Sequence, residues 1–88
     1  LADGLLASVQ AALAAAGVTA RDVTVVRVPG SHEVPWAAHE LAAGGRRDAV
    51  IELGVLIGGD TNHHEMVGAS VSHALQSVAV ATRVPVIN

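Results

Sequence analysis

Ten residues near the middle of the chain read DAVIELGVLI, from Asp48 to Ile57. Apart from Glu52, the stretch after Asp48 is apolar or glycine, and it is rich in β-branched side chains. Such a continuous apolar run is typical of a strand that is covered on both faces of a parallel sheet. It is far too short to cross a bilayer. The run therefore predicts a buried parallel strand.

Helical patterns flank this strand on both sides. Apolar residues at helical spacing predict one helix from Asp3, its expected N-cap, to Gly17 and another from Val34-Pro35 to Gly44-Gly45. A third helix is expected to begin at Asp60 or Thr61. Its buried stripe would consist of Val67, Val71, Ala74, Leu75 and Val78. Segments 23–28 and 82–88 are rich in β-branched residues and predict two further strands.

The resulting order alternates helix and strand, which implies parallel pairing and right-handed crossovers. The predicted fold class is α/β, a three-layer α/β/α sandwich with a parallel sheet. With 88 residues, the chain is long enough for one domain, 1–88. Because it starts in a helix and stops on a strand, we expect a fragment of a longer polypeptide that lacks a first strand and C-terminal helices.

Composition narrows the classes of function. Five arginines, no lysine and eight acidic residues give a net charge of −3, which argues against binding to nucleic acid or an anionic membrane. The absence of cysteine excludes disulfides, thiolate nucleophiles and Cys-ligated metal sites. No signal segment opens the sequence, so we expect a soluble cytoplasmic protein.

Polar residues gather where each predicted strand ends. The first strand is followed by PGSHEVP (29–35), the second by GGDTNHHE (58–65), and the third ends at Asn88. Ligands of open parallel sheets bind beyond the carboxyl ends of the strands. We therefore expect one crevice to collect a hydroxyl, a carboxylate, an amide and up to three imidazoles.

The glycine-rich segment before the third helix suits an anion. Gly58 and Gly59 let backbone N–H groups approach a phosphate or carboxylate at a helix N-terminus, although a simple capped turn has the same pattern. His63 follows in the first turn. A neutral imidazole there could move protons in general acid–base catalysis, and a histidine without a function is the alternative.

Several other polar residues have plain structural interpretations. A metal site built from His32, His63 and His64 is conceivable, but the spacing of the zinc proteases is absent. Glu52 lies in an apolar strand and needs a partner, either Arg46, Arg47 or a neighbouring subunit. His39 and His73 are expected to be solvated, and Trp36 to pack in the core or an interface.

Taken together, VVRVPGSHEVP, DAVIELGVLIGGDTNHHEMV and VPVIN resemble the lumazine synthase (6,7-dimethyl-8-ribityllumazine synthase) family. The resemblance implies a flavodoxin-like sandwich that forms homopentamers or larger assemblies, with riboflavin synthase as a further partner. It also implies a cofactor-independent transferase of riboflavin biosynthesis. The reaction condenses 5-amino-6-(D-ribitylamino)uracil with 3,4-dihydroxy-2-butanone 4-phosphate and releases phosphate.

The same resemblance assigns site residues by motif position, with no metal. His63 matches the acid–base catalyst, and Asp60 and Thr61 match the phosphate-binding pair. The positions that match the substrate pocket are Ser31, His32, Glu33, Val55, Leu56, Ile57 and Asn88.

Two other functions stay open on the sequence alone. One is a non-catalytic paralogue that acts as an oligomeric ligand-binding or shell-forming protein. The other is a histidine-rich metal-binding domain. Both draw on departures from the family pattern, which usually has an aromatic residue at His32 and at His64 and a basic residue at Gly58.

Overall fold

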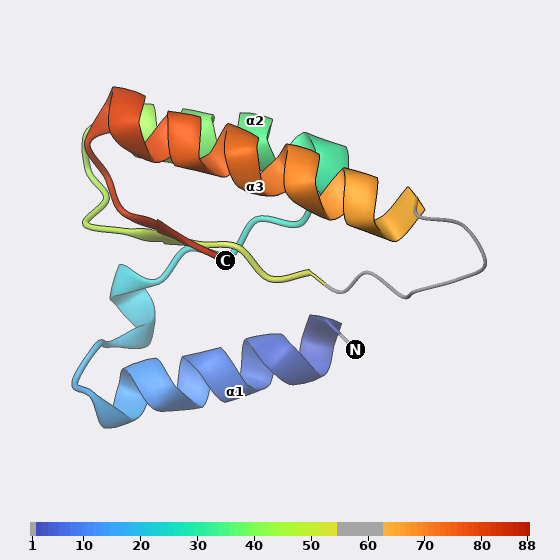
Figure 1. Ribbon diagram of the computed structural model, residues 1–88. Helices are drawn as coiled ribbons and strands as arrows, with labels where there is room; N and C mark the ends of the chain where they lie inside the picture. Colours follow the sequence, from blue (N-terminus) through green and yellow to red (C-terminus); the bar gives the residue numbers. More distant parts are fainter. Residues whose placement is uncertain (1, 55–62) are drawn as a thin grey trace.

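The computed structural model describes the backbone of residues 2–54 and 63–88 and the side chains of 3–54 and 66–88. Its elements in chain order are α1 (Ala2–Ala15), the 3₁₀ turns η1 (Ala20–Asp22) and η2 (Ser31–Glu33), α2 (Val34–Ala43), β1 (Val50–Ile51), α3 (His63–Thr82) and β2 (Val86–Ile87). Figure 1 shows α2 and α3 side by side above the two strands, with α1 below them.

The two strands pair in parallel, with Val50 opposite Val86 and Ile51 opposite Ile87. The Val50 N–H donates to the Pro85 carbonyl over 2.9 Å, and the ladder continues past the strand where the Glu52 N–H donates to the Ile87 carbonyl over 2.7 Å. α3 lies between the strands in the chain, as parallel pairing requires. The prediction of an α/β fold with a parallel sheet is confirmed.

Both strands are shorter than predicted. β1 covers two residues of the segment predicted from Asp48, and positions 55–57 of that segment lie outside the described residues. β2 begins at Val86, because Thr82 still belongs to α3. Arg83 then ends the helix with a left-handed φ of 61°, and its N–H donates to the Ala79 carbonyl.

The core lies between the sheet and the α2–α3 layer. The predicted stripe of α3 is confirmed at four positions, while Ala74 is half-buried. Leu75 is the most deeply buried side chain among those described, at 1% exposure. Among the residues whose side chains are described, the buried ones are Ala38, Ala42, Val67, Val71, Leu75, Val78, Val84 and Val86.

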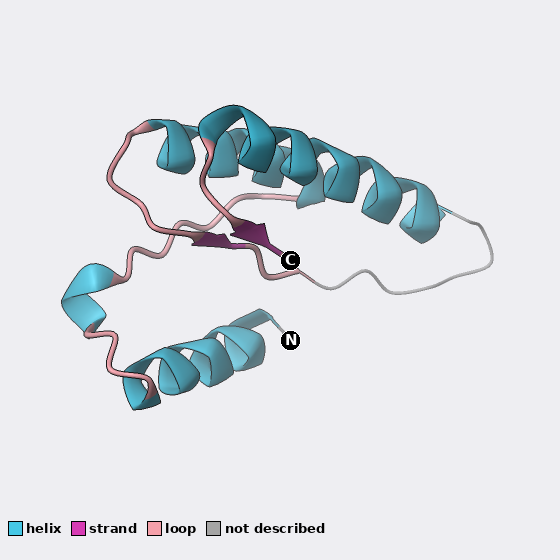
Figure 2. Ribbon diagram, turned by 60° about the vertical axis from the view of Figure 1, so that its left-hand side comes forward, coloured by secondary structure: helices cyan, strands magenta, loops and turns pink. Residues whose placement is uncertain are grey.

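The opposite face of the sheet is open. Because side chains alternate along a strand, Ile51 and Ile87 point away from the core, and they are 40% and 56% exposed. α1 lies on that side in both ribbon views (Figures 1 and 2), but none of its described side chains is buried. An exposed ion pair between Asp3 and Arg27, 2.9 Å apart, links α1 to the extended segment that follows it.

The predicted strand over 23–28 is wrong in the described structure. The segment is extended, with Val23 at φ −115° and ψ 121°, but it forms no sheet ladder within residues 2–54 and 63–88. Val25 and Val26 are consequently 45% and 51% exposed. β-Branched residues favour an extended backbone, but a strand also needs a neighbouring strand with which to pair.

The boundaries of the first two helices follow the predicted signals with one correction. α1 starts at Ala2, so Asp3 lies inside its first turn and is not the N-cap. Gly17, with φ +96°, ends α1, where the Val18 N–H donates to the Leu13 carbonyl over 2.9 Å. This is the Schellman arrangement, in which glycine adopts the left-handed conformation.

α2 begins at Val34 with Pro35 in its first turn, as predicted. Trp36 is 69% exposed, so it does not pack in the core of this chain, and His39 and His73 are exposed as expected. Across the described residues, none of the helices is both long and apolar enough to cross a membrane.

Candidate functional site

A depression of about 160 Å³ lies between the bend that precedes α2, at residues 28–34, and the end of β1. Two stretches of chain form it, one before and at the start of α2 and the other after β1. Its lining residues are Val28, Gly30, Ser31, Val34, Glu52, Leu53 and Gly54. The bend thus lies next to the end of β1, while the expected crevice also includes segment 58–65, of which positions 58–62 lie outside the described residues.

The bend is built by Pro29-Gly30 and the 3₁₀ turn that follows. The Glu33 N–H donates to the Gly30 carbonyl over 3.2 Å, which closes the turn. The Glu33 carboxylate folds back over Gly30, since a Cβ placed there would lie 3.0 Å from Oε2. This geometry leaves Ser31 half-buried in the depression, while His32 and Glu33 are exposed beside it.

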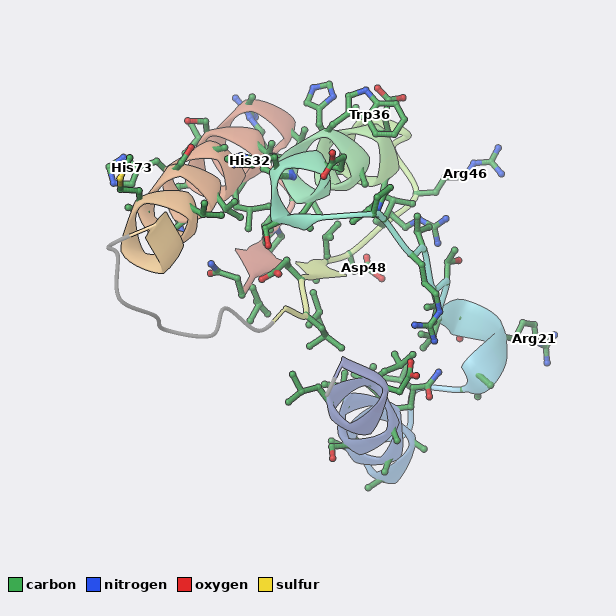
Figure 3. All side chains as sticks on the ribbon, turned by 90° about the vertical axis from the view of Figure 1, so that its right-hand side faces the viewer. Arg21, His32, Trp36, Arg46, Asp48 and His73 are labelled. Atoms are coloured by element: carbon green, nitrogen blue, oxygen red, sulfur yellow. The ribbon has the colours of Figure 1, made fainter. Side chains whose placement is uncertain are left out.

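η2 also packs against α2 and α3. Figure 3 shows His32 beside these two helices, on the side of the sheet where they pack. His32 therefore belongs to a turn that packs against α3. This helix begins at His63.

Asn88 follows β2 at the same edge of the sheet. Its Nδ2 donates a hydrogen bond to Oγ of Ser72 over 3.2 Å, and so contacts α3. The preceding residue, Ile87, accepts the hydrogen bond from Glu52. Asn88 is thus adjacent to the strand end that lines the depression, although it is not one of the lining residues.

Glu52 lines the depression and is half-buried. Its partial burial removes water from the carboxylate, which raises the pKa above its ordinary value of 4.5. The predicted partners do not meet it: Arg47 donates instead to Oγ1 of Thr24 over 2.9 Å. Arg46 is exposed, and Figure 3 shows it pointing outward. Within the described part of the chain, Glu52 has no ion-pair partner.

The other predicted site residues cannot be placed in this arrangement. Val55, Leu56, Ile57, Asp60 and Thr61 lie outside the described residues, as do the side chains of His63 and His64. The described structure therefore brings together Ser31 and Glu52, with Glu33 and Asn88 next to them.

The sequence predicts Glu52 to be a carboxylate in an apolar strand that needs a partner, and the motifs do not assign it to the site. The signal that could have assigned it is its place near the carboxyl end of an apolar strand, where ligands of parallel sheets bind. A serine hydroxyl, a glutamate and apolar walls can hold a small polar molecule through donor–acceptor pairs. Among the described residues, no three metal-ligating side chains cluster together.

Comparison with known proteins identifies the relatives of this chain. A sequence model of 6,7-dimethyl-8-ribityllumazine synthase matches residues 1–88. A 6,7-dimethyl-8-ribityllumazine synthase from Xanthomonas campestris pv. campestris (strain B100) is 42% identical over 88 residues, which are 100% of this chain and 57% of that protein.

Proteins of the same name from two other organisms are also similar. That of Kineococcus radiotolerans is 51% identical over 84 residues, covering 96% of this chain and 50% of the relative. That of Edwardsiella ictaluri is 46% identical over 85 residues, covering 96% and 54%. The chain thus spans about half the length of these curated relatives. Because the family model matches the chain from end to end, the chain belongs to the 6,7-dimethyl-8-ribityllumazine synthase family.

Proposed function

We propose that this chain is the central part of a lumazine synthase, a transferase of riboflavin biosynthesis. The proposed reaction condenses 5-amino-6-(D-ribitylamino)uracil with 3,4-dihydroxy-2-butanone 4-phosphate and releases phosphate. The observation that carries the proposal is the match of the family model to residues 1–88, and the position of the bend at Ser31 beside the end of β1 supports it. The relatives described above are all named as the enzyme, which gives no support to a non-catalytic role.

In this proposal the aminouracil binds beyond the carboxyl ends of the strands, beside the bend at Ser31. Ser31 and Glu33 would hydrogen-bond its ring and ribityl hydroxyls, His32 would lie against the ring, and Asn88, just after β2, would contact it. The apolar residues Val55, Leu56 and Ile57 would complete the pocket. Asp60 and Thr61 would receive the phosphate of the second substrate.

His63 would move the protons that the reaction requires. The primary amine attacks the ketone carbonyl, and loss of water gives an imine. Elimination then expels phosphate, the second amine attacks the remaining carbonyl, and loss of a second water closes the ring. A histidine at the start of α3 can give and take protons in these steps, and positioning of the two reactants supplies much of the remaining rate. No cofactor takes part in this sequence.

The complete protein would have a flavodoxin-like three-layer sandwich. Residues that precede and follow this segment would add a strand and helices, and would cover the exposed face at Ile51 and Ile87. We further propose that it assembles as a homopentamer or larger shell in the cytoplasm, with riboflavin synthase as a partner.

Replacement of His63 tests the catalytic assignment in the full-length protein. His63→Ala should lower kcat by about 10²-fold or more, the usual contribution of a general acid–base group. His73→Ala is the matched control, because His73 is exposed on the same helix, and it should keep the wild-type rate. A His63→Ala enzyme with unchanged kcat would refute the assignment.

A further inference from the structure

We propose that Ser72 is a positioning residue that selects the uracil ring, because it holds the Asn88 amide ready to pair with the ring's N–H and carbonyl groups. The inference rests on the proposed function and adds a residue of α3 that the motifs do not assign. It follows from the direction of the Asn88 side chain, from the hydrogen bond that Ser72 accepts, and from the groups that this bond leaves free.

The direction of the Asn88 side chain is the first argument. Side chains alternate along a strand, so Asn88 lies on the same face as Val84 and Val86, which are both buried in the core beneath α3. Ile87 points to the open face instead. The Asn88 amide is thus exposed at the carboxyl end of β2, where ligands of parallel sheets bind, and it lies next to α3.

The support that Ser72 gives is the second argument. Ser72 is half-buried on α3, one turn before the fully buried Leu75, so its backbone is fixed by the core. Its Oγ accepts a hydrogen bond from Nδ2 of Asn88 over 3.2 Å. The hydroxyls of Ser77 and Thr82 on the same helix behave differently, since each donates to a carbonyl one turn earlier. Ser72 therefore links a side chain of the strand end to a rigid part of the helix.

The groups that remain free on Asn88 are the third argument. A primary amide has two N–H donors and one oxygen acceptor, so donation of one N–H to Ser72 leaves Oδ1 and the second N–H for a ligand. A uracil ring carries an N–H between two carbonyls, and an amide pairs with it by accepting from the N–H and donating to a carbonyl. The butanone phosphate has no N–H group. An amide held in this orientation therefore favours the aminouracil.

The test starts with Ser72→Ala in the full-length protein. An exposed amide without this support must be ordered when the substrate binds, so KM for the aminouracil should rise about three- to tenfold. KM for butanone phosphate should change less than about twofold, as expected when only one substrate loses a contact. Ser72→Thr retains the hydroxyl and should restore a KM close to that of wild type. Ser77→Ala is the matched control on the same helix and should leave both constants unchanged.

A double-mutant cycle shows whether Ser72 acts through Asn88. Asn88→Ala should itself raise KM for the aminouracil, and addition of Ser72→Ala to that variant should raise it no further, because the two residues act as one unit. A serine that only stabilised the helix would keep its effect when the amide is absent.

A modified substrate identifies the ring group that the amide recognises. An aminouracil methylated at the nitrogen between the two ring carbonyls cannot donate to Oδ1. Wild type and Ser72→Ala should therefore bind this analogue, measured as a competitive inhibitor, within about twofold of each other.

The outcomes separate the inference from the proposed function. If wild type turns over and Ser72→Ala keeps the wild-type KM for the aminouracil, the inference alone is refuted. It is also refuted if KM for both substrates rises equally, if Ser72→Ala keeps its effect in the Asn88→Ala variant, or if the analogue loses affinity as the substrate does. If wild type forms no product, the proposed function fails and the inference fails with it.

Discussion

The Asn88 side chain donates a hydrogen bond to the Ser72 hydroxyl over 3.2 Å, which joins the end of β2 to α3. Through the adjacent Ile87 carbonyl, the same strand end accepts the N–H of Glu52, a residue that lines the depression. The contact therefore links the orientation of a proposed substrate-binding amide to the longest helix of the described chain.

Removal of this hydrogen bond should affect binding more than folding. Ser72→Ala frees the Asn88 amide, and since the bond is exposed, its loss should lower the free energy of unfolding by no more than about 1 kcal/mol. KM for the aminouracil should rise severalfold with kcat nearly unchanged. Ser77→Ala is the control, because its hydroxyl donates to the His73 carbonyl within the same helix. Equal KM values for the two variants would show that Ser72 does not position Asn88.

The core should be most sensitive at Leu75. This side chain is 1% exposed at the centre of the α3 stripe, so Leu75→Ala should lower the free energy of unfolding by about 2 to 5 kcal/mol. Val80 is 80% exposed on the same helix, and Val80→Ala should stay within about 0.5 kcal/mol of wild type. Urea denaturation at a fixed protein concentration measures both, and similar losses would contradict the packing of α3.

Gly4 within α1 and Gly17 just past its C-terminal end should respond to alanine with opposite signs. Gly17 has φ +96°, which alanine adopts only with strain, so Gly17→Ala should destabilise the protein by about 1 kcal/mol or more. Gly4 is helical and has open space around its Cα, so Gly4→Ala should stabilise it by about 0.5 to 1 kcal/mol. Thermal unfolding of the two variants and wild type measures both effects. A Tm that shifts in the same direction for both variants would show that α1 does not end at Gly17.

Glu52 should make stability depend on pH. Burial raises its pKa above 4.5, so the folded protein holds this proton more tightly than the unfolded chain does. The stabilisation is complete below pH 4.5 and is lost as the pH rises through the raised pKa. Glu52→Gln lacks this loss, so its stability relative to wild type should increase with pH across that window. If the difference in free energy of unfolding between Glu52→Gln and wild type stays the same from acid to neutral pH, burial does not raise the pKa of Glu52.

The sequence predicted the α2–α3 layer well because its signals are local. The spacing of Val67, Val71, Leu75 and Val78 indicates one buried face, and the Gly17 and Pro35 signals mark helix boundaries. None of these signals depends on a distant part of the chain.

Predictions that depend on distant partners succeeded less often. Segment 23–28 has the composition of a strand, but pairing needs a neighbouring strand, and none is formed with it in the described structure. Trp36 is expected to pack in the core or an interface, and because it is 69% exposed in the described chain, only the interface stays a prediction. Composition indicates that a residue favours burial, but it does not indicate which surface will cover it.

The candidate site was predicted in part. The rule that ligands bind beyond parallel strands located the bend at Ser31 next to the end of β1. It did not reveal that Glu52 lines the depression, because the direction of a side chain depends on the strand register, and here on the missing Cβ of Gly54. Of the expected partners of Glu52, Arg47 donates to Thr24 and Arg46 is exposed, while pairing with a neighbouring subunit stays a prediction.

The most direct test of the proposed function is the activity of the complete protein with both substrates. Formation of 6,7-dimethyl-8-ribityllumazine is followed by its fluorescence, and released phosphate is measured in the same samples. We expect product and phosphate to appear in equal amounts, at a rate that increases in proportion to enzyme concentration and without added cofactor. Product formation no faster than in the absence of protein would contradict the proposal.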